Sequence, residues 1–197
     1  MTATPMSDAE ISPPGTVAVV LAGGLGTRLA NTLPGIAKPM APVCGRPFIE
    51  WVVRFLAASG LKQVRIATGF LGQTIEEHFG RVPIEGVDVR CVRETSQLGT
   101  GGALLNAGQT CGGKPATWLV CNGDSLILDS LRGLFATLVA THAEAAIFSR
   151  RVPDASAYGS LEVGLDGMLR AFSEKPSDCG AARPPGRASR AGLLTHA

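Results

Sequence analysis

The glycine-rich stretch at residues 16–40 limits what this chain can fold into more than any other part of the sequence. It starts with an apolar run at residues 17–22, three of them valine, which predicts a buried β-strand. The run ends at Gly23 and Gly24, and Gly26 follows. Because glycine has no side chain, the backbone N–H groups of this loop stay accessible to a ligand. A buried strand that opens into such a loop predicts a binding site for phosphate groups.

Cationic side chains belong to the same loop system. Thr27 adds a hydroxyl group, and Arg28 adds a planar guanidinium that matches phosphate oxygens in pairs. Lys38 adds a second cation directly before Pro39, and a residue in that position favours an extended backbone. We therefore predict that the loop binds a polyphosphate and that Arg28 and Lys38 are its catalytic cations.

Two better-known glycine loops do not fit this stretch. A P-loop needs a lysine directly after its last glycine, and a dinucleotide-binding turn needs a third glycine where this chain has Leu29. A plain strand-to-helix turn with a surface arginine is the simplest alternative. The phosphate site is favoured because the strand, Arg28, Lys38 and the elements further along the chain all agree with it.

At these residues a family resemblance becomes visible. The sequence LAGGLGTRL at residues 21–29, followed by Lys38-Pro39-Met40, resembles the N-terminal fingerprint of the sugar-1-phosphate nucleotidylyltransferases. Among these enzymes it most resembles the guanylyltransferases of D-glycero-D-manno-heptose 1-phosphate, and the likeness runs over residues 17–176. The resemblance implies a mostly parallel, Rossmann-like α/β nucleotidyltransferase sheet, with helices on both faces and an antiparallel hairpin.

The pattern of apolar runs agrees with that fold class. Strand and helix patterns alternate as β-α-β-α-β, which is typical of a parallel sheet whose ligands gather at the carboxyl ends of the strands. Beyond this alternation, a further helix at residues 130–142 and a strand at 145–149 lead to an antiparallel hairpin. The predicted strands lie at residues 17–22, 64–68, 87–92, 117–121, 145–149, 158–163 and 168–172. The predicted helices lie at residues 47–59, where Gly60 ends the helix, and at 73–79, 103–107 and 130–142.

Composition excludes several kinds of partner. The chain has 197 residues, 45% of them hydrophobic and 17% charged, which is enough to bury one core. Its net charge is only +2, without a basic cluster before residue 183, so we expect neither a nucleic-acid nor a membrane partner. The five cysteines form no C-x-x-C pair, which is typical of free thiols in the cytoplasm. The resemblance is also compatible with a homo-oligomer.

A second glycine-rich turn, at residues 94–103, opens a helix. Exposed N–H groups at a helix start suit an anion or the edge of a base, although a plain helix start capped by Thr100 fits the spacing equally well. By resemblance, Gln97, Gly99 and Thr100 would recognise guanine. Together with the first loop, the resemblance implies a nucleotide site made by Leu21, Ala22, Gly23, Gly24, Gly26, Thr27, Gln97, Gly99, Thr100 and Asn122.

An acidic residue follows the strand predicted at residues 117–121. Asn122-Gly123-Asp124 stands at its carboxyl end, where a carboxylate is costly unless it faces water or a cation. Mg²⁺ is usually bound by one or two carboxylates together with phosphate oxygens of the substrate. A simple turn is the alternative for this tripeptide. Its place after a strand, and its match to the metal-binding aspartate of the family, favour Asp124 as a ligand of a Mg²⁺ cofactor.

The sugar side of the site is assigned by resemblance alone. Tyr158 and Gly159 would line it, Glu174 would reach sugar hydroxyls, and Lys175 would bind the phosphate of the sugar. For Glu174 and Lys175 a surface charge pair is the alternative.

The two ends of the chain do not follow the family pattern. Residues 1–15 and 177–197 are rich in proline and poor in apolar side chains, so we expect disordered tails around a domain at residues 16–176. The relatives continue where residues 177–197 lose the pattern. We therefore expect the C-terminal part of the domain to be missing, through a frameshift or a premature end, or else a genuine short variant.

Two functions of different classes fit these observations. The first is transfer of a nucleoside monophosphate from an NTP, by resemblance GTP, to a sugar 1-phosphate, with release of pyrophosphate. The implied acceptor is D-glycero-D-manno-heptose 1-phosphate, and mannose or glucose 1-phosphate with GTP or dTTP are the alternatives. The second is a truncated, inactive protein of the same fold that binds a nucleotide or another subunit. Release of pyrophosphate separates the two.

Overall fold

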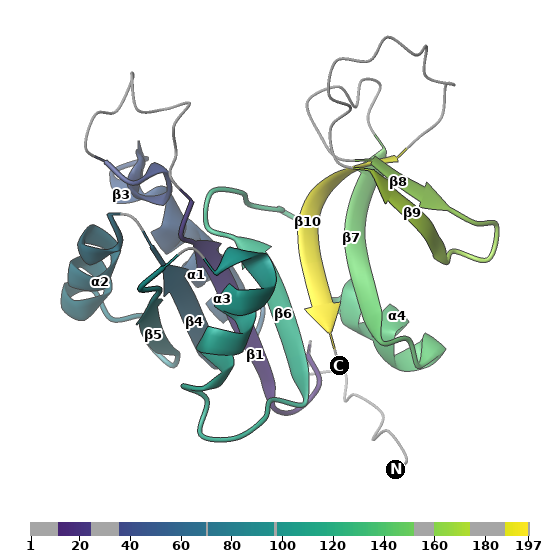
Figure 1. The fold of residues 1–197 in the computed structure, drawn as a ribbon, viewed down its shortest axis with the longest axis horizontal. Helices are drawn as coiled ribbons and strands as arrows, with labels where there is room; N and C mark the ends of the chain where they lie inside the picture. The colour runs from purple at the N-terminus through teal and green to yellow at the C-terminus, as the bar shows by residue number, and fades with distance from the viewer. Residues whose placement is uncertain are drawn as a thin grey trace, which may run out of the picture. The chain divides into compact units, whose positions relative to one another are not determined.

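The computed structural model describes residues 12–24, 36–69, 71–96, 98–151, 160–173 and 188–196 (Figure 1). The chain divides into two compact units, Met1–Ala146 with Leu194–Ala197, and Ile147–Leu193. Among the residues placed by the structure, no helix is long and apolar enough to cross a membrane.

The first unit contains four parallel strands in the order β5-β4-β1-β6. They are β1 (Thr16–Ala22), β4 (Gln63–Thr68), β5 (Asp88–Arg93) and β6 (Thr117–Asn122). In the central strand β1, the side chains of Ala18, Val19 and Val20 are fully buried, as the apolar run predicts for a strand covered on both faces. Leu21 is in register with Ala67 of β4 and with Asn122 of β6, so the carboxyl ends of these strands lie at one edge.

Helices cover both faces of this sheet. The structure has α1 (Phe48–Ala58), α2 (Gly72–Arg81), α3 (Gly99–Gly108) and α4 (Arg132–Thr141). Helix α3 packs against β1 and β4, and Figure 1 shows α1 on the opposite face. This arrangement confirms the predicted parallel sheet with helices on both sides, and the predicted strands and helices lie within a few residues of their predicted positions.

The segment between β1 and α1 differs from the prediction. Lys38 is not extended but begins a single 3-10 turn, η1 (Lys38–Met40). Two backbone hydrogen bonds hold this turn, from Met40 N to Ala37 O and from Ala41 N to Lys38 O. A small antiparallel hairpin of β2 (Pro42–Val43) and β3 (Arg46–Pro47) follows. The sequence pattern does not indicate this hairpin, because each of its two-residue strands contains a proline, which argues against a strand.

The second unit contains the predicted antiparallel hairpin. Strands β8 (Ser160–Val163) and β9 (Leu169–Ser173) pair with Leu161 opposite Phe172. Strand β7 (Ala145–Arg151) pairs with a strand that the sequence does not predict, β10 (Ala188–His196). Strand β10 also pairs with β8, and this second pairing is antiparallel. The sequence analysis expected a tail at these residues, where the structure has a strand. The sequence ASRAGLLTH lacks β-branched residues apart from one threonine and has no apolar alternation, which is why its strand was not predicted.

A buried carboxylate stabilises the packing of α1. The Glu50 side chain is only 2% exposed, and its oxygens accept hydrogen bonds from Arg46 at 2.5 Å and Arg54 at 2.7 Å. Nε2 of His78 in α2 lies 2.9 Å from the other oxygen. Burial by itself raises the pKa of the Glu50 carboxyl, but the hydrogen bonds from Arg54, Arg46 and His78 outweigh it, and the pKa lies below its ordinary value of 4.5.

We expect Glu50→Gln to lower the free energy of unfolding at neutral pH by about 1–3 kcal/mol, because it weakens hydrogen bonds to charged groups. A lowered pKa in the folded state stabilises the protein above pH 4.5, and this contribution is lost as the pH falls through the lower folded-state pKa. The variant should therefore lose less stability than the wild type when acidified. Urea unfolding at neutral pH and at pH values below 4.5 measures both effects. Equal losses of stability in the two proteins on acidification would contradict this role of Glu50.

Candidate functional site

The residues predicted to bind the nucleotide meet at the carboxyl edge of the parallel sheet. Gly23 and Gly24 directly follow β1, Gly69 follows β4, Glu94 follows β5, and Gly123 and Asp124 follow β6. This is the edge at which parallel α/β sheets bind ligands. The topology therefore brings together segments that are up to a hundred residues apart in the sequence.

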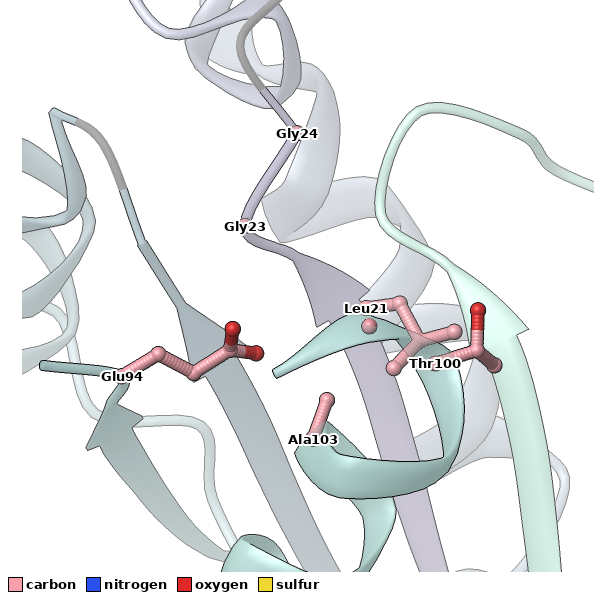
Figure 2. Close-up of a pocket in the computed structure, with 7 residues that line it drawn as sticks. Leu21, Gly23, Gly24, Glu94, Thr100 and Ala103 are labelled. Carbon is pink, nitrogen blue, oxygen red and sulfur yellow. The ribbon is translucent and has the colours of Figure 1, made fainter. Parts of the chain in front are cut away.

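A pocket opens at this edge between the end of β1 and the start of α3 (Figure 2). Its volume is about 480 Å³, which lies in the range of small-molecule sites. Polar groups reach it from Glu94 and Thr100, and the rest of its wall is glycine backbone and aliphatic side chain. The residues that line it are Leu21, Gly23, Gly24, Glu94, Gly99, Thr100 and Ala103.

Close approach of two backbones shapes one wall of the pocket. A Cβ atom on Gly69 would lie 2.8 Å from the carbonyl oxygen of Gly23 and 3.0 Å from its Cα, closer than real Cβ atoms come to backbone. A Cβ on Gly23 would in turn lie 3.5 Å from Oε1 of Glu94. The close approach therefore needs glycine at position 69, whereas a Cβ on Gly23 would make only ordinary contacts. Gly69 contributes to the shape of this edge, although the sequence analysis did not single it out.

The opposite wall is the first turn of α3. Gly99 begins the helix with φ at +67°, a left-handed conformation that favours glycine. The N-cap residue is Leu98, and no side chain caps the helix. Thr100 lies inside the helix and lines the pocket, so the alternative of a plain helix start capped by Thr100 is wrong. The N–H groups of this turn have no side-chain cap that would compete with a ligand.

The predicted catalytic lysine meets the predicted metal ligand. Nζ of Lys38 lies 2.7 Å from Oδ2 of Asp124, although the two residues are 86 positions apart in the sequence. Ser125 donates a hydrogen bond to the other oxygen of Asp124 at 3.3 Å. Both charged side chains remain partly exposed, 42% for Lys38 and 31% for Asp124, so incoming phosphate groups or ions can reach them.

Asp124 fits the kind of site that Mg²⁺ uses with nucleotides. Within the described ranges there is no cluster of three or more acidic, histidine or cysteine side chains that could enclose a metal. A site with a single accessible carboxylate at a strand end instead matches an ion that takes its remaining ligands from water and substrate phosphates.

Residues 17–189 of the chain match the family model described as "nucleotidyl transferase". The chain belongs to this family. This match ends at residue 189, whereas the sequence analysis found the family resemblance only as far as residue 176. The family identifies the chain as an enzyme, a nucleotidyltransferase, which agrees with the enzyme class expected from its motifs.

Similar sequences and solved structures support the same family assignment. The chain is 32% identical to D-glycero-alpha-D-manno-heptose 1-phosphate guanylyltransferase of Aneurinibacillus thermoaerophilus, over 80% of this chain and 67% of the relative. It is 34% identical to mannose-1-phosphate guanylyltransferase of Mycobacterium tuberculosis, over 82% of this chain and 44% of the relative. Among solved structures, HddC from Yersinia pseudotuberculosis superimposes with a TM-score of 0.77 at 26% identity, covering 91% of this chain and 75% of HddC. A second structure of HddC, in complex with GMP-PN, gives a TM-score of 0.72 at 25% identity, covering 90% and 74% of the two chains.

The structure of this nucleotidyltransferase brings many of its predicted site residues together. Five predicted nucleotide-binding residues, Leu21, Gly23, Gly24, Gly99 and Thr100, line the pocket. Ala22 belongs to the same strand end, but its side chain is buried, and Asn122 is exposed at the end of β6. The other predicted residues lie outside the described part of the chain: Gly26, Thr27, Arg28, Gln97, Tyr158, Gly159, Glu174 and Lys175.

The sequence analysis did not assign Glu94, although its position contained the necessary signal. The residue directly follows β5, at the edge where ligands bind, and it opens the turn that was predicted to contact the base.

Proposed function

We propose that this nucleotidyltransferase transfers GMP from GTP to D-glycero-D-manno-heptose 1-phosphate, giving GDP-heptose and pyrophosphate. The observation that carries the proposal is the pocket between the Gly23-Gly24 turn and the first turn of α3, at the edge of the sheet where β6 leads into Asp124 and its partner Lys38. It offers an apolar wall and a polar edge for a nucleoside, with charged groups at the same edge of the sheet for its phosphates. The guanine base and the heptose are suggested by the names of the relatives.

The reaction needs no general base. The phosphate of the sugar is already ionised at neutral pH, and one of its oxygens attacks the α-phosphorus of GTP. A bond forms between that oxygen and the α-phosphorus, the bond from the α-phosphorus to the bridging oxygen breaks, and pyrophosphate leaves with the electron pair. The enzyme has to position the two phosphates and neutralise charge at the α-phosphorus.

Lys38 and Arg28 supply that neutralisation in our proposal. The Lys38 ammonium has three N–H donors, and Asp124 accepts from one of them, so the others can turn to phosphate oxygens. Arg28 would bind the leaving pyrophosphate through its planar guanidinium. Asp124 would bind Mg²⁺, which when bound neutralises charge on the nucleotide phosphates.

The acceptor site follows from the family resemblance. Lys175 would bind the phosphate of the sugar, and Glu174 would accept hydrogen bonds from sugar hydroxyls. Tyr158 and Gly159 would line the same side.

A matrix of substrates tests the choice of base and sugar. Pyrophosphate release is measured with GTP, ATP, UTP, CTP or dTTP, each combined with heptose, mannose or glucose 1-phosphate in the presence of Mg²⁺. We expect the highest kcat/KM for GTP with D-glycero-D-manno-heptose 1-phosphate, and formation of GDP-heptose by mass spectrometry. A clear preference for another pair would contradict the proposed substrates. Nucleotide binding without pyrophosphate release from any pair would contradict transferase activity of this chain.

A further inference from the structure

We propose that Gly69 is a positioning residue for nucleotide binding, which fixes the path of the Gly23-Gly24 turn through a direct contact between two backbones. The inference rests on the proposed function, because it takes the pocket beside this turn as the nucleotide site. Gly69 is not among the described residues that line the pocket, so it acts through Gly23 rather than by touching the ligand.

The backbone after β4 approaches the backbone after β1 closely at this point. A Cβ at position 69 would lie 2.8 Å from the carbonyl oxygen of Gly23, 3.0 Å from its Cα and 3.3 Å from its carbonyl carbon. Ordinary contacts of a Cβ begin at 3.4 Å, so a side chain at position 69 requires the two backbones to separate by about 0.6 Å. Backbone conformation is not the reason for glycine here, because the φ angle of Gly69 lies outside the left-handed region. The contact alone excludes a side chain.

The segment around Gly69 is held in place by β5 and α2. Thr68, the last residue of β4, is fully buried, and its carbonyl oxygen accepts a hydrogen bond from the N–H of Glu94 at 2.8 Å. The hydroxyl of Thr68 donates to Glu76 of α2 at 3.1 Å. The carbonyl oxygen of Gly69 accepts from the N–H of Gly72 at 2.9 Å, which closes the turn into α2. This side of the contact therefore yields little.

The turn after β1 is the freer side of the contact. Strand β1 is fixed as far as Leu21, whose carbonyl oxygen accepts a hydrogen bond from the N–H of Gly123 at 2.8 Å, next to the pairing of β1 with β6. Gly24, in contrast, is exposed, and a Cβ there would meet no atom within 4 Å. A side chain at position 69 therefore displaces Gly23 and Gly24 rather than the sheet.

This displacement would change the wall of the pocket. Figure 2 shows Gly23 and Gly24 following the end of β1, and both line the pocket. Their backbone N–H groups are the donors that a glycine turn offers to phosphate oxygens. A binding site needs its groups within about 0.5 Å of the productive geometry, so a displacement of about 0.6 Å is enough to weaken binding. Gly69 therefore affects the ligand although it is not part of the pocket wall.

Gly69→Ala tests the inference through equilibrium binding of GTP in the presence of Mg²⁺, measured by titration calorimetry and without turnover. We expect the affinity to fall about 10- to 100-fold, since a misplacement of about 1 Å costs about 100-fold at a site. In the ligand-free protein, the amide NMR signals of Gly23 and Gly24 should also shift, because their backbone has moved. A role of Gly69 in stability alone would change neither quantity.

Gly72→Ala is the matched control, because it introduces a similar clash in the same turn, against Thr68 rather than Gly23. A Cβ on Gly72 would lie 2.7 Å from Cβ and 3.0 Å from Oγ1 of the buried Thr68. This variant should lose as much stability in thermal unfolding as Gly69→Ala, yet bind GTP as the wild type does. If Gly69→Ala does not fold, the contact belongs to the core of the fold and the inference is wrong.

The outcomes separate this inference from the proposed function. If GDP-heptose forms but Gly69→Ala binds GTP as tightly as the wild type, the function stands and the role of Gly69 is wrong. If Gly69→Ala alone weakens GTP binding but the wild type transfers nothing to any sugar 1-phosphate, the inference stands and the proposed function is wrong. Equal losses of affinity in Gly69→Ala and Gly72→Ala, or no binding of GTP by the wild type, would overturn the inference.

Discussion

Lys38→Ala is expected to lower kcat for nucleotidyl transfer about 10²- to 10³-fold, the usual cost of removing one preorganised group that stabilises charge in the transition state. The structure gives the reason, because Nζ of Lys38 lies 2.7 Å from Asp124 at the ligand-binding edge of the sheet and remains partly exposed. Charge develops on the leaving pyrophosphate during the reaction, so the lysine should affect the rate more than the ground-state affinity for the nucleotide.

The loss should not come from unfolding. An ion pair that is as exposed as that of Lys38 and Asp124 contributes about 0–1 kcal/mol to stability, so Lys38→Ala should unfold close to the wild-type temperature. Lys62→Ala is the matched control, since Lys62 is an exposed lysine that does not line the pocket. Steady-state kinetics of pyrophosphate release provide the measurement. A wild-type kcat in the Lys38 variant would exclude the lysine from the catalytic role.

Asp124→Asn is expected to weaken binding of the Mg²⁺ complex of GTP by about 100-fold or more, because replacement of groups at a metal site typically costs 10- to 100-fold even beyond the direct ligands. Asn keeps the shape of the side chain but removes the charge that would bind the cation. The variant should also lose most of the difference between GTP affinities measured with and without Mg²⁺.

Calorimetric titration of wild type and variant, with Mg²⁺ and with a chelator, measures both quantities. Asp166→Asn is the control, because Asp166 is an exposed aspartate of the β8–β9 turn that pairs with Arg170. Together with the two single variants, a double variant of Lys38 and Asp124 measures the coupling energy between the two side chains. This energy is expected to differ from zero because the side chains are in contact. Unchanged affinity and unchanged dependence on Mg²⁺ in Asp124→Asn would assign the metal to other residues.

The sequence predicted the architecture of the first unit because its elements follow from local patterns. The valine-rich run of β1 is buried on both faces, and the apolar residues of α1 recur at helical spacing, so periodicity alone indicates both elements. The alternation of strands and helices then requires a parallel sheet, and a parallel sheet puts the ends of β1, β5 and β6 at one edge. This is why Lys38 and Asp124 could be assigned to one site from the sequence.

What the sequence did not predict depends on contacts between distant segments. The burial of Glu50 is compensated by Arg54 and Arg46 and also by His78 of another helix, whereas a glutamate within an amphipathic pattern is normally expected on the surface. Gly69 matters because the backbone of Gly23 passes next to it, which no local signal indicates. Glu94 looks like an ordinary polar residue after a strand until α3 is placed opposite it.

The central claim is that this chain transfers the α-phosphoryl group of GTP, with its nucleoside, to a sugar 1-phosphate. It is tested most directly by following radioactive phosphorus from GTP labelled at the α-position or at the γ-position, in the presence of Mg²⁺ and D-glycero-D-manno-heptose 1-phosphate. We predict that the α-label appears in GDP-heptose and the γ-label in pyrophosphate. A γ-label on the sugar product, or both labels remaining in GTP while the protein binds it, would contradict the account.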